Sequence, residues 1–445
     1  MKRHLLIFTF TLLVLGNPIF AAPSQAAEKP PATEIPTALV DYVTRPDPTF
    51  AWEIKQRSDG NLGRVYRVEL TSQKWQGIVW KHALNIHEPQ HIQYPRHVLL
   101  FIRSGNNVDL SRGDDIQLGL ALANLAGARV AILHQVPNQP LLGNHQEDDL
   151  ISETWLHYLA TGDANWPLLF PMVKSAVRAM DAVEAIAKQQ WNGTSTAFVA
   201  TGMSKRGWTT WLTAAADKRV IAIAPMVIDV LNFRPQMKYQ LETWGDFSEM
   251  IADYTRKGLI KTGDETSRET ELRRMMDPYT YLGRLSLPKL LIHGTNDPYW
   301  VVDATQFYWD DMVGEKYVLK VANVGHGLGR SLLSAFHTLS AFFRHAVDGT
   351  PLPALQWTRT EHDGELSLRV TSSIAPKAAL FWTAHSATAD FRNAQWQSDS
   401  LAGKDGAFVA AVRKPEHDHL AFFAELLFEM PGLPYSLTTL VWRYE

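Results

Sequence analysis

A serine flanked by glycines marks the most informative stretch of the sequence. In TGMSKRGWTTW, residues 201–211, Ser204 lies between Gly202 and Gly207. The apolar run AFVA precedes the first glycine, and WTTWLTAAAD after the second has helical character. A strand, a tight turn and a helix together present a serine hydroxyl as a nucleophile. Such turns are also common without any chemistry, so this motif alone leaves both interpretations open.

An acid and a histidine follow in two later loops. GTNDPYW places Asp297 after the apolar run 288–293, and NVGHGLG places His326 after the strand-like run 317–321. A serine hydroxyl needs an imidazole to take its proton, and a carboxylate must hold that imidazole in the correct tautomer. Serine, acid and histidine, each after a parallel strand, is the chain order of α/β-hydrolase triads. The sequence therefore predicts Ser204 as nucleophile, His326 as base and Asp297 as orienting acid.

The acid has a competitor and an alternative role. Asp229 directly follows the strand-like run 222–228 and is the alternative acid. We rank it second because Asp297 leaves the usual spacing to the histidine strand. Asp297 could also serve only as a turn residue that caps the Asn-Asp-Pro bend.

Three backbone amides are candidates for an oxyanion hole. The Lys205 amide lies at the predicted helix N-terminus, where it would point at a developing negative charge. Gly105 and Asn106 follow the buried run 97–102, where hydrolases of this type place a second amide, although a plain strand-to-helix turn fits equally well.

Two further groups of side chains could take part. The HQEDD cluster, residues 145–149, could bind a cation, but a solvated acidic start to the following helix is favoured. We predict no metal site and no cofactor. Near the proposed site lie four aromatic residues that could form a platform, although most aromatic side chains fill cores: Trp208, Trp211, Tyr299 and Trp300.

Composition narrows the possible partners. The chain has 445 residues, 46% of them hydrophobic, and a formal charge of -3. It is long enough to bury a large core, and it lacks the basic balance that nucleic-acid binding requires. It contains no cysteine, which excludes disulfides, thiolate metal sites and cysteine nucleophiles.

The N-terminus resembles a secretory signal. Residues 1–26 combine a cationic start, an apolar core and small residues at a cleavage site. The apolar run is short for a membrane span, so we expect no stable membrane anchor after cleavage and a periplasmic or secreted protein. Residues 27–36, rich in Pro and Ala, are predicted to form a flexible leader.

Apolar periodicity predicts an α/β protein. Two alternating runs, 65–70 and 77–86, predict a β-hairpin or meander with a turn at 72–75. Continuous apolar runs that predict buried parallel strands then alternate with amphipathic stretches that predict helices: strands 97–102, 129–135 and 196–200, and helices 114–126, 170–189 and 305–312. We predict an α/β-hydrolase fold with a mainly parallel sheet over residues 37–350, carrying a helical insertion at 231–285.

The C-terminal part has a different pattern. Short strand-like runs separated by turn residues replace the helices: 366–370, 378–383, 407–412, 420–428 and 437–444. Residues 354–445 are therefore predicted to form a small β-sandwich, Ig-like or fibronectin-like. It could bind a surface or a polymer, or it could only stabilise the hydrolase part.

Several motifs in one order resemble the PhoPQ-activated pathogenicity-related proteins, to which the autocrine proliferation repressor proteins are similar. The resemblance rests on TWLHYLATGDANWP, PMVKSAVRAMDAV, GMSKRGWTTWLTAAADKRV, PMVIDVLNF, DPYTYLGRL and NVGHG. It implies an exported serine-hydrolase-like α/β fold with Ser204, Asp297 and His326 as the triad. The second glycine stands one residue later than in G-x-S-x-G, so Arg206 occupies a position usually held by a small residue; glucuronoyl esterases resemble this spacing.

Two functions remain open on the sequence. The first is an exported serine hydrolase that cleaves an ester or amide of a small molecule, peptide or polymer through an acyl-enzyme intermediate. The second is a catalytically silent hydrolase fold used for binding or signalling. The presence of all three triad residues favours the first.

Overall fold

The computed structural model describes residues 34–107, 116–191, 193, 196–350 and 352–444. The predicted signal peptide and most of the predicted leader lie outside the described residues. Residues Ile35–Glu445 form one compact unit. Among the helices of the described residues, none combines the length and the apolar composition that crossing a bilayer requires.

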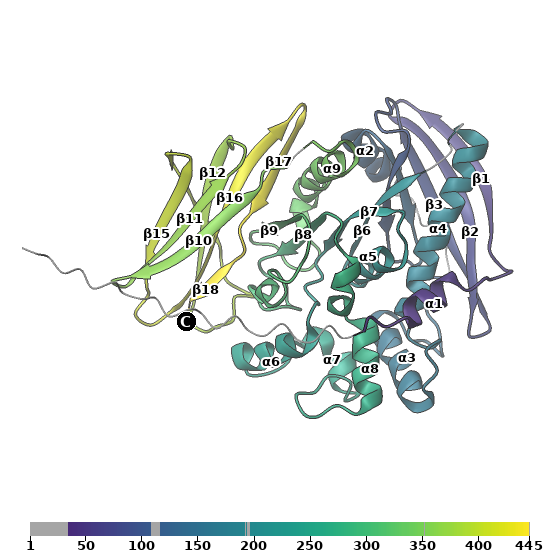
Figure 1. Ribbon diagram of the computed structural model, residues 1–445, viewed down its shortest axis with the longest axis horizontal. Coiled ribbons are helices and arrows are strands. Elements are labelled where there is room, and N and C mark those ends of the chain that lie inside the picture. Colours follow the sequence, from purple (N-terminus) through teal and green to yellow (C-terminus); the bar gives the residue numbers. More distant parts are fainter. Residues whose placement is uncertain (1–33, 108–115, 192, 194–195, 351, 445) are drawn as a thin grey trace, which may run out of the picture. The chain divides into compact units, whose positions relative to one another are not determined.

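A nine-stranded sheet, in the order β1-β2-β3-β5-β4-β6-β7-β8-β9, forms the centre of this unit (Figure 1). Its last six strands in that order pair in parallel, and β1 to β3 join them as an antiparallel edge. The strands are β1 (Ala51–Gly60), β2 (Gly63–Trp75), β3 (Ile78–Pro89), β4 (His97–Ile102), β5 (Arg129–Leu133), β6 (Ala197–Met203), β7 (Val220–Met226), β8 (Lys289–Gly294) and β9 (Lys316–Val321). With helices on both faces, this is the predicted α/β-hydrolase fold.

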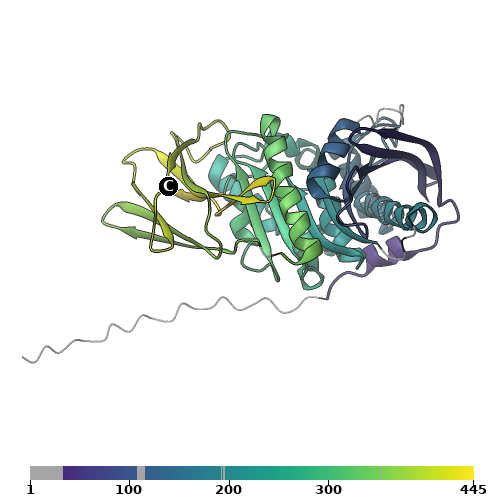
Figure 2. The same cartoon turned by 90° about the horizontal axis from the view of Figure 1, so that it is seen from above.

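Helices cover both faces of the sheet, which is why its inner strands are continuously apolar. On one face α1 (Ala38–Thr44), α4 (Leu169–Gln190) and α5 (Lys205–Ala216) contribute to one hydrophobic core. On the other face α2 (Ile116–Ala126) and α9 (Leu332–Asp348) contribute to a second core (Figures 1 and 2). Every residue of β5 is buried between these layers.

The hairpin turn differs from the prediction. Residues 72–75 belong to β2, and the turn comes after them at Gln76 and Gly77, with φ values of 47° and 80°. Two consecutive residues with positive φ make the tight turn that suits the twist of a hairpin, so Trp75 pairs with Ile78. A register shift between β2 and β3 at Thr71/Gln73 falls inside the span where the turn was expected.

Short helices fill the predicted insertion. They are α6 (Phe233–Trp244), α7 (Ala252–Thr255), α8 (Ser267–Met276) and two 3₁₀ turns, Glu249–Ile251 and Pro278–Arg284. Of these, α7 and α8 lie beside α3 (Glu147–Thr161) in Figure 1. The helix expected at 305–312 is only a 3₁₀ turn, Ala304–Phe307. Its backbone hydrogen bonds join residues three apart, as from Tyr308 N to Thr305 O. The hydroxyl groups of Thr305 and Tyr308 both donate to the buried carboxylate of Asp229.

The C-terminal part is all-β, as predicted. One sheet contains β10 (Leu355–His362), β11 (Glu365–Ser372), β15 (Ala407–Arg413) and β14 (Gly403–Lys404). The other contains β13 (Gln397–Ser400), β12 (Ala378–Ser386), β16 (His419–Met430), β17 (Leu433–Thr438) and β18 (Trp442–Tyr444). The single strand expected at 437–444 is divided between the end of β17 and β18, which both pair with β16. Apolar side chains of β11, β16 and α9 share one core.

Candidate active site

Ser204 occupies a strained turn between β6 and α5. Its φ and ψ of 56° and -128° are uncommon for any residue with a side chain. The turn is held from both sides, because Ser204 N donates to Met226 O at 2.9 Å and Ser204 O accepts from Trp208 N at 3.0 Å. Strain of this kind persists only where surrounding contacts impose it, and it clusters at functional sites.

The two glycines of the motif are both required by close approach. A Cβ on Gly202 would lie 2.6 Å from Arg206 O. A Cβ on Gly207 would lie 2.6 Å from Cγ2 of Ile228 and 2.9 Å from Gly202 O. The second glycine therefore stands where α5 crosses the strand ends, and the wider spacing of this motif is compatible with a tightly packed turn.

The structure brings the three predicted triad residues together. Ser204 Oγ lies 2.7 Å from Nε2 of His326, and Nδ1 of His326 lies 2.8 and 3.1 Å from the two Asp297 oxygens. The Asp297 side chain is 5% exposed and that of His326 is 24% exposed. With Nδ1 carrying the proton, His326 donates to Asp297 and its free Nε2 faces the serine hydroxyl.

Asp297 also has the role that the sequence offered as an alternative. Its Oδ1 accepts the N–H of Tyr299 at 2.9 Å, so the carboxylate caps the Asn-Asp-Pro bend while it contacts the histidine. The bend in turn places the Tyr299 ring 4.2 Å from the His326 ring, at an interplanar angle of 31°. Burial, together with Asp148, raises the pKa of Tyr299, which keeps this phenol neutral beside the imidazole.

Asp229, the alternative acid, lies in a different cluster. It accepts hydrogen bonds from Thr305 at 2.7 Å and Tyr308 at 2.6 Å, and Lys320 Nζ lies 3.5 Å away. Burial alone would raise the pKa of Asp229, but His293 and Lys320 lower it overall, so the group remains ionised. These contacts are typical of a buried carboxylate that stabilises the fold.

The HQEDD cluster forms the acidic start of a helix, as favoured from the sequence, but it is only partly solvated, because Asp148 is buried. Helix α3 does begin at Glu147, but the Glu147 carboxylate accepts two hydrogen bonds from the Arg206 guanidinium, at 2.6 and 2.7 Å. Asp148 accepts one from Lys205 Nζ at 2.7 Å. The Arg206 and Lys205 side chains are 6% and 9% exposed. The described residues contain no group of three or more His, Asp and Glu able to hold a metal ion.

These pairs connect α5, the helix that follows Ser204, to the loop after β4. Gln139 Nε2 donates to Glu147 Oε1 at 2.7 Å and to Gly105 O at 3.2 Å. Arg206 Nε also donates to Val136 O at 2.5 Å. A continuous set of polar contacts therefore runs from Arg206 through Glu147 and Gln139 to Gly105. The sequence analysis did not predict these contacts, although the acidic residues 147–149 and the adjacent basic residues Lys205 and Arg206 carry opposite charges.

The oxyanion candidates lie at the same edge of the sheet as Ser204. Strands β4 and β6 pair with Ile102 opposite Gly202, so the loop that carries Gly105 and Asn106 leaves the sheet beside the serine turn. Lys205 N belongs to the first turn of α5, where N–H groups have no acceptor within the helix.

Three of the four aromatic residues fill the core rather than form a platform. Trp208, Trp211 and Trp300 are 5%, 0% and 8% exposed. Trp208 Nε1 donates to Met276 O at 2.6 Å, which ties α5 to the insertion. Tyr299 is the member of the group that stacks on the candidate site.

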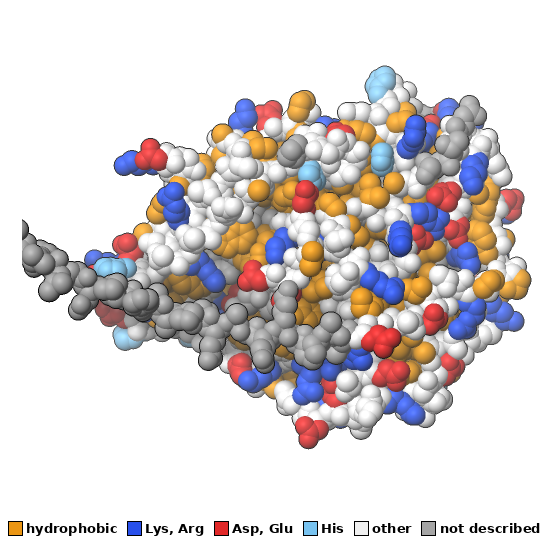
Figure 3. Space-filling model, in the orientation of Figure 1, with side chains coloured by type: hydrophobic (Ala, Val, Ile, Leu, Met, Phe, Trp, Pro, Cys, Tyr) orange, Lys and Arg blue, Asp and Glu red, His pale blue; other side chains and the backbone are white. Residues whose placement is uncertain are grey.

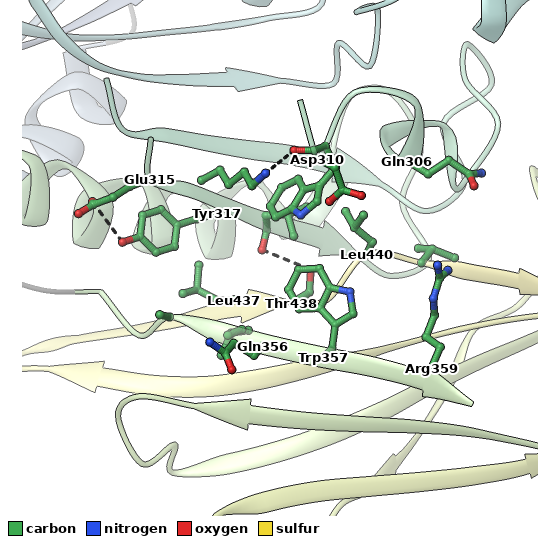
Figure 4. Close-up of a pocket in the computed structure, with 16 residues that line it drawn as sticks. Gln306, Asp310, Glu315, Tyr317, Gln356, Trp357, Arg359, Leu437, Thr438 and Leu440 are labelled. Atoms are coloured by element: carbon green, nitrogen blue, oxygen red, sulfur yellow. Dashed lines mark hydrogen bonds between the residues drawn. The ribbon is translucent and has the colours of Figure 1, made fainter. Parts of the chain in front are cut away.

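A cavity of about 520 Å³ lies elsewhere, between β9 and the C-terminal strands β10 and β17 (Figure 4). Trp309 and Trp357 line it, with ring centroids 5.8 Å apart. It opens beside Lys316 and Tyr317 at the beginning of β9, whereas His326 follows the end of that strand. The cavity is therefore separate from the candidate active site.

On the face shown in Figure 3, acidic and basic side chains are interspersed.

The chain is similar to several known proteins. Over 424 residues, the chain is 30% identical to autocrine proliferation repressor protein A of Dictyostelium discoideum, covering 87% of this chain and 85% of that protein. Among solved structures, it is similar to acetyl xylan esterase 1 of Thermoanaerobacterium, with 16% identity, a TM-score of 0.49, and coverage of 70% of this chain and 94% of that one. It is also similar to an acetyl xylan esterase of Paenibacillus, with 14% identity, a TM-score of 0.45, and coverage of 69% and 90%. Residues 39–392 match the family described as PhoPQ-activated pathogenicity-related protein, and the chain belongs to that family.

Proposed function

We propose that this protein is a serine hydrolase that cleaves an ester or amide bond through Ser204, His326 and Asp297. The observation that carries the proposal is the pair of short contacts on either side of His326, 2.7 Å to Ser204 Oγ and 2.8 Å to Asp297 Oδ2. They occur on a serine held in a strained turn at the N-terminus of a helix. The predicted signal sequence adds the proposal that the protein acts in the periplasm or outside the cell.

In the proposed acylation step, Ser204 Oγ attacks the substrate carbonyl carbon while Nε2 of His326 takes the hydroxyl proton. Asp297 holds the Nδ1–H and stabilises the imidazolium that forms. The imidazolium then donates its proton to the departing alcohol or amine, and the C–O or C–N bond breaks. The acyl group remains on Ser204 as an ester.

Deacylation repeats these steps with water as the nucleophile. His326 takes a proton from the water molecule, the acid product leaves, and the proton returns to Ser204 Oγ. In both steps we assign the Lys205 amide, with Gly105 or Asn106, to the negative oxygen of the tetrahedral intermediate. The Arg206–Glu147–Gln139 contacts would hold the two sides of that oxyanion hole at a fixed separation.

A fluorophosphonate probe tests the proposal directly. A base-activated serine attacks phosphorus, whereas ordinary serines do not. We expect the wild type to be labelled at Ser204 and Ser204→Ala to be folded but unlabelled. Ser398→Ala, which changes a serine on the exposed strand β13, is the matched control and should be labelled normally.

The same experiment distinguishes the second candidate function. The Dictyostelium relative is named as a repressor of proliferation, and a chain that acted only by binding would not need an activated serine. A folded wild type that is not labelled would favour the binding protein. Labelling that persists in Ser204→Ala would place the nucleophile elsewhere.

A further inference from the structure

The loops that carry Asp297 and His326 are both hydrogen-bonded to one segment of the C-terminal part. This segment, residues 391–396, is the second part of the connection between β12 and β13. Asn296, next to the acid, donates from Nδ2 to Ala394 O at 2.8 Å and to Arg392 O at 3.2 Å. Asn323, three residues before the histidine, donates from Nδ2 to Trp396 O at 2.9 Å and accepts the Trp396 N–H at 2.8 Å.

The two loops are also closely joined to each other. Asn296 N donates to Val324 O at 3.0 Å, and Asn323 N donates to the Thr295 hydroxyl at 3.0 Å. A Cβ on Gly294 would lie 2.3 Å from Val324 O, so the backbones are in direct contact. Acid loop and histidine loop thus form one unit, and the segment 391–396 bonds to both halves of it.

The segment is itself anchored in the β-sandwich. Phe391 and Trp396 are 2% and 4% exposed and share a small core with Phe423 of β16. Val302 and Ala322 of the hydrolase part pack against this core. The guanidinium carbon of Arg392 lies 4.1 Å from the ring centroid of Trp244, at the end of α6. A loop between two strands of the second sheet, anchored by buried aromatic side chains, therefore reaches the loops that carry Asp297 and His326.

We propose that the segment 391–396 positions the triad: it holds the acid and histidine loops in the arrangement in which Asp297 meets His326. This rests on the proposed function and gives the C-terminal sheets a role in it. Asn296 and Asn323 are positioning residues, because they act through the two loops. The Asn323 amide pairs with Trp396 through both its donor and its acceptor, as a strand residue would.

The sharpest test removes the Asn323 amide without straining the backbone. Asn323 has a φ of 58°, which glycine adopts freely, so Asn323→Gly is the appropriate variant. We expect it to fold and to react with the fluorophosphonate on the order of 10²-fold more slowly, because a small displacement of the histidine loop misaligns the base. Asn232→Gly is the matched control: it has a φ of 63° and donates to Phe307 O at 2.9 Å. It should lose stability but keep the wild-type labelling rate.

A double-mutant cycle separates positioning from general weakening. If Asn323 acts through the Asp297–His326 contact, Asn323→Gly should slow labelling strongly in the wild type and hardly at all in an Asp297→Asn background. Equal losses in both backgrounds, or a wild-type rate in folded Asn323→Gly, would overturn the inference. If Asn323→Gly does not fold, Asn296→Ala makes the same comparison. A wild type that is not labelled at all would instead overturn the proposed function, and this inference with it.

Discussion

Arg206 and Glu147, 59 residues apart in the sequence, are joined by two parallel hydrogen bonds of 2.6 and 2.7 Å. The pair fixes Arg206, two residues after Ser204, to the first turn of α3. A guanidinium and a carboxylate in this bidentate arrangement fix direction as well as distance. The large side chain at a position usually held by a small one is thus part of the support of the serine turn.

Glu147→Gln should remove a pH-dependent part of the stability. Burial raises the pKa of Glu147, but Arg206 and Lys205 lower it from 4.5 to about 2. Because the folded-state pKa is depressed, the stabilisation is present above pH 4.5 and is lost as the pH falls toward 2. Melting temperatures of wild type and variant should therefore differ at neutral pH and converge in acid. Glu242→Gln, at an exposed pair, should show little difference; a pH-independent gap for Glu147→Gln would contradict the assignment.

Asp297→Asn and Asp229→Asn should fail in different ways. An amide at position 297 favours the wrong imidazole tautomer, so we expect a loss of about 10⁴-fold in kcat with the fold intact. An amide at position 229 leaves Lys320, 2% exposed in its side chain, without its buried anion and should cost about 3–5 kcal/mol of stability. Turnover of a p-nitrophenyl ester, per folded molecule, should remain near wild type for Asp229→Asn. The reverse pattern would reassign the acid.

Gly207→Ala should disturb the turn that holds Ser204. The new methyl would overlap Ile228 and Gly202 O, and such overpacking costs about 1–3 kcal/mol. Probe labelling should slow as well, because relief of the overlap moves α5 and the Lys205 amide. Gly263→Ala is the control, since nothing lies within 4 Å of its Cβ position. Wild-type stability and labelling in Gly207→Ala would show that a methyl group fits at this position and would contradict the prediction.

Two buried histidines should make the protein sensitive to mild acid. Burial lowers the pKa of His82 from 6.5 to about 4 and that of His293 to about 3. The unfolded chain therefore binds more protons than the folded one below pH 6.5, and stability falls as the pH drops, by about 1.4 kcal/mol per pH unit for each group. Urea unfolding between pH 7 and 4 measures this slope. His82→Gln should make it shallower, and a change at the exposed His91 should not.

Much of the layout of the candidate active site could be predicted from local sequence patterns. The runs that became β4 and β6 are mainly apolar because helices cover both faces of the sheet, and β8 and β9 have apolar centres flanked by Lys or His. Ser204, Asp297 and His326 follow β6, β8 and β9. Parallel strands bring such positions to one edge whatever their distance in sequence.

The features that the sequence did not predict depend on contacts between distant residues or have only weak local sequence patterns. Strand β13, QSDS, is fully exposed, and β10 is exposed over most of its length, so neither shows the alternation that identifies a strand. The contact of Glu147 with Arg206 is decided by the packing of α3 on α5, which no local periodicity encodes. Asp229 and Asp297 each lie in the loop after a parallel strand, so the sequence pattern does not distinguish them. The geometry of the two loops shows that Asp297 contacts His326.

The contacts of the segment 391–396 also bear on the order in which the protein becomes active. A ribosome makes Ser204, Asp297 and His326 before it makes residues 391–396 and β18, whose Arg443 donates to Tyr239 at 2.7 Å. If the triad depends on that segment, a nascent chain carries every reactive group but lacks the support that aligns them. The alignment of Ser204, His326 and Asp297 would then depend on a segment synthesised after all three of them.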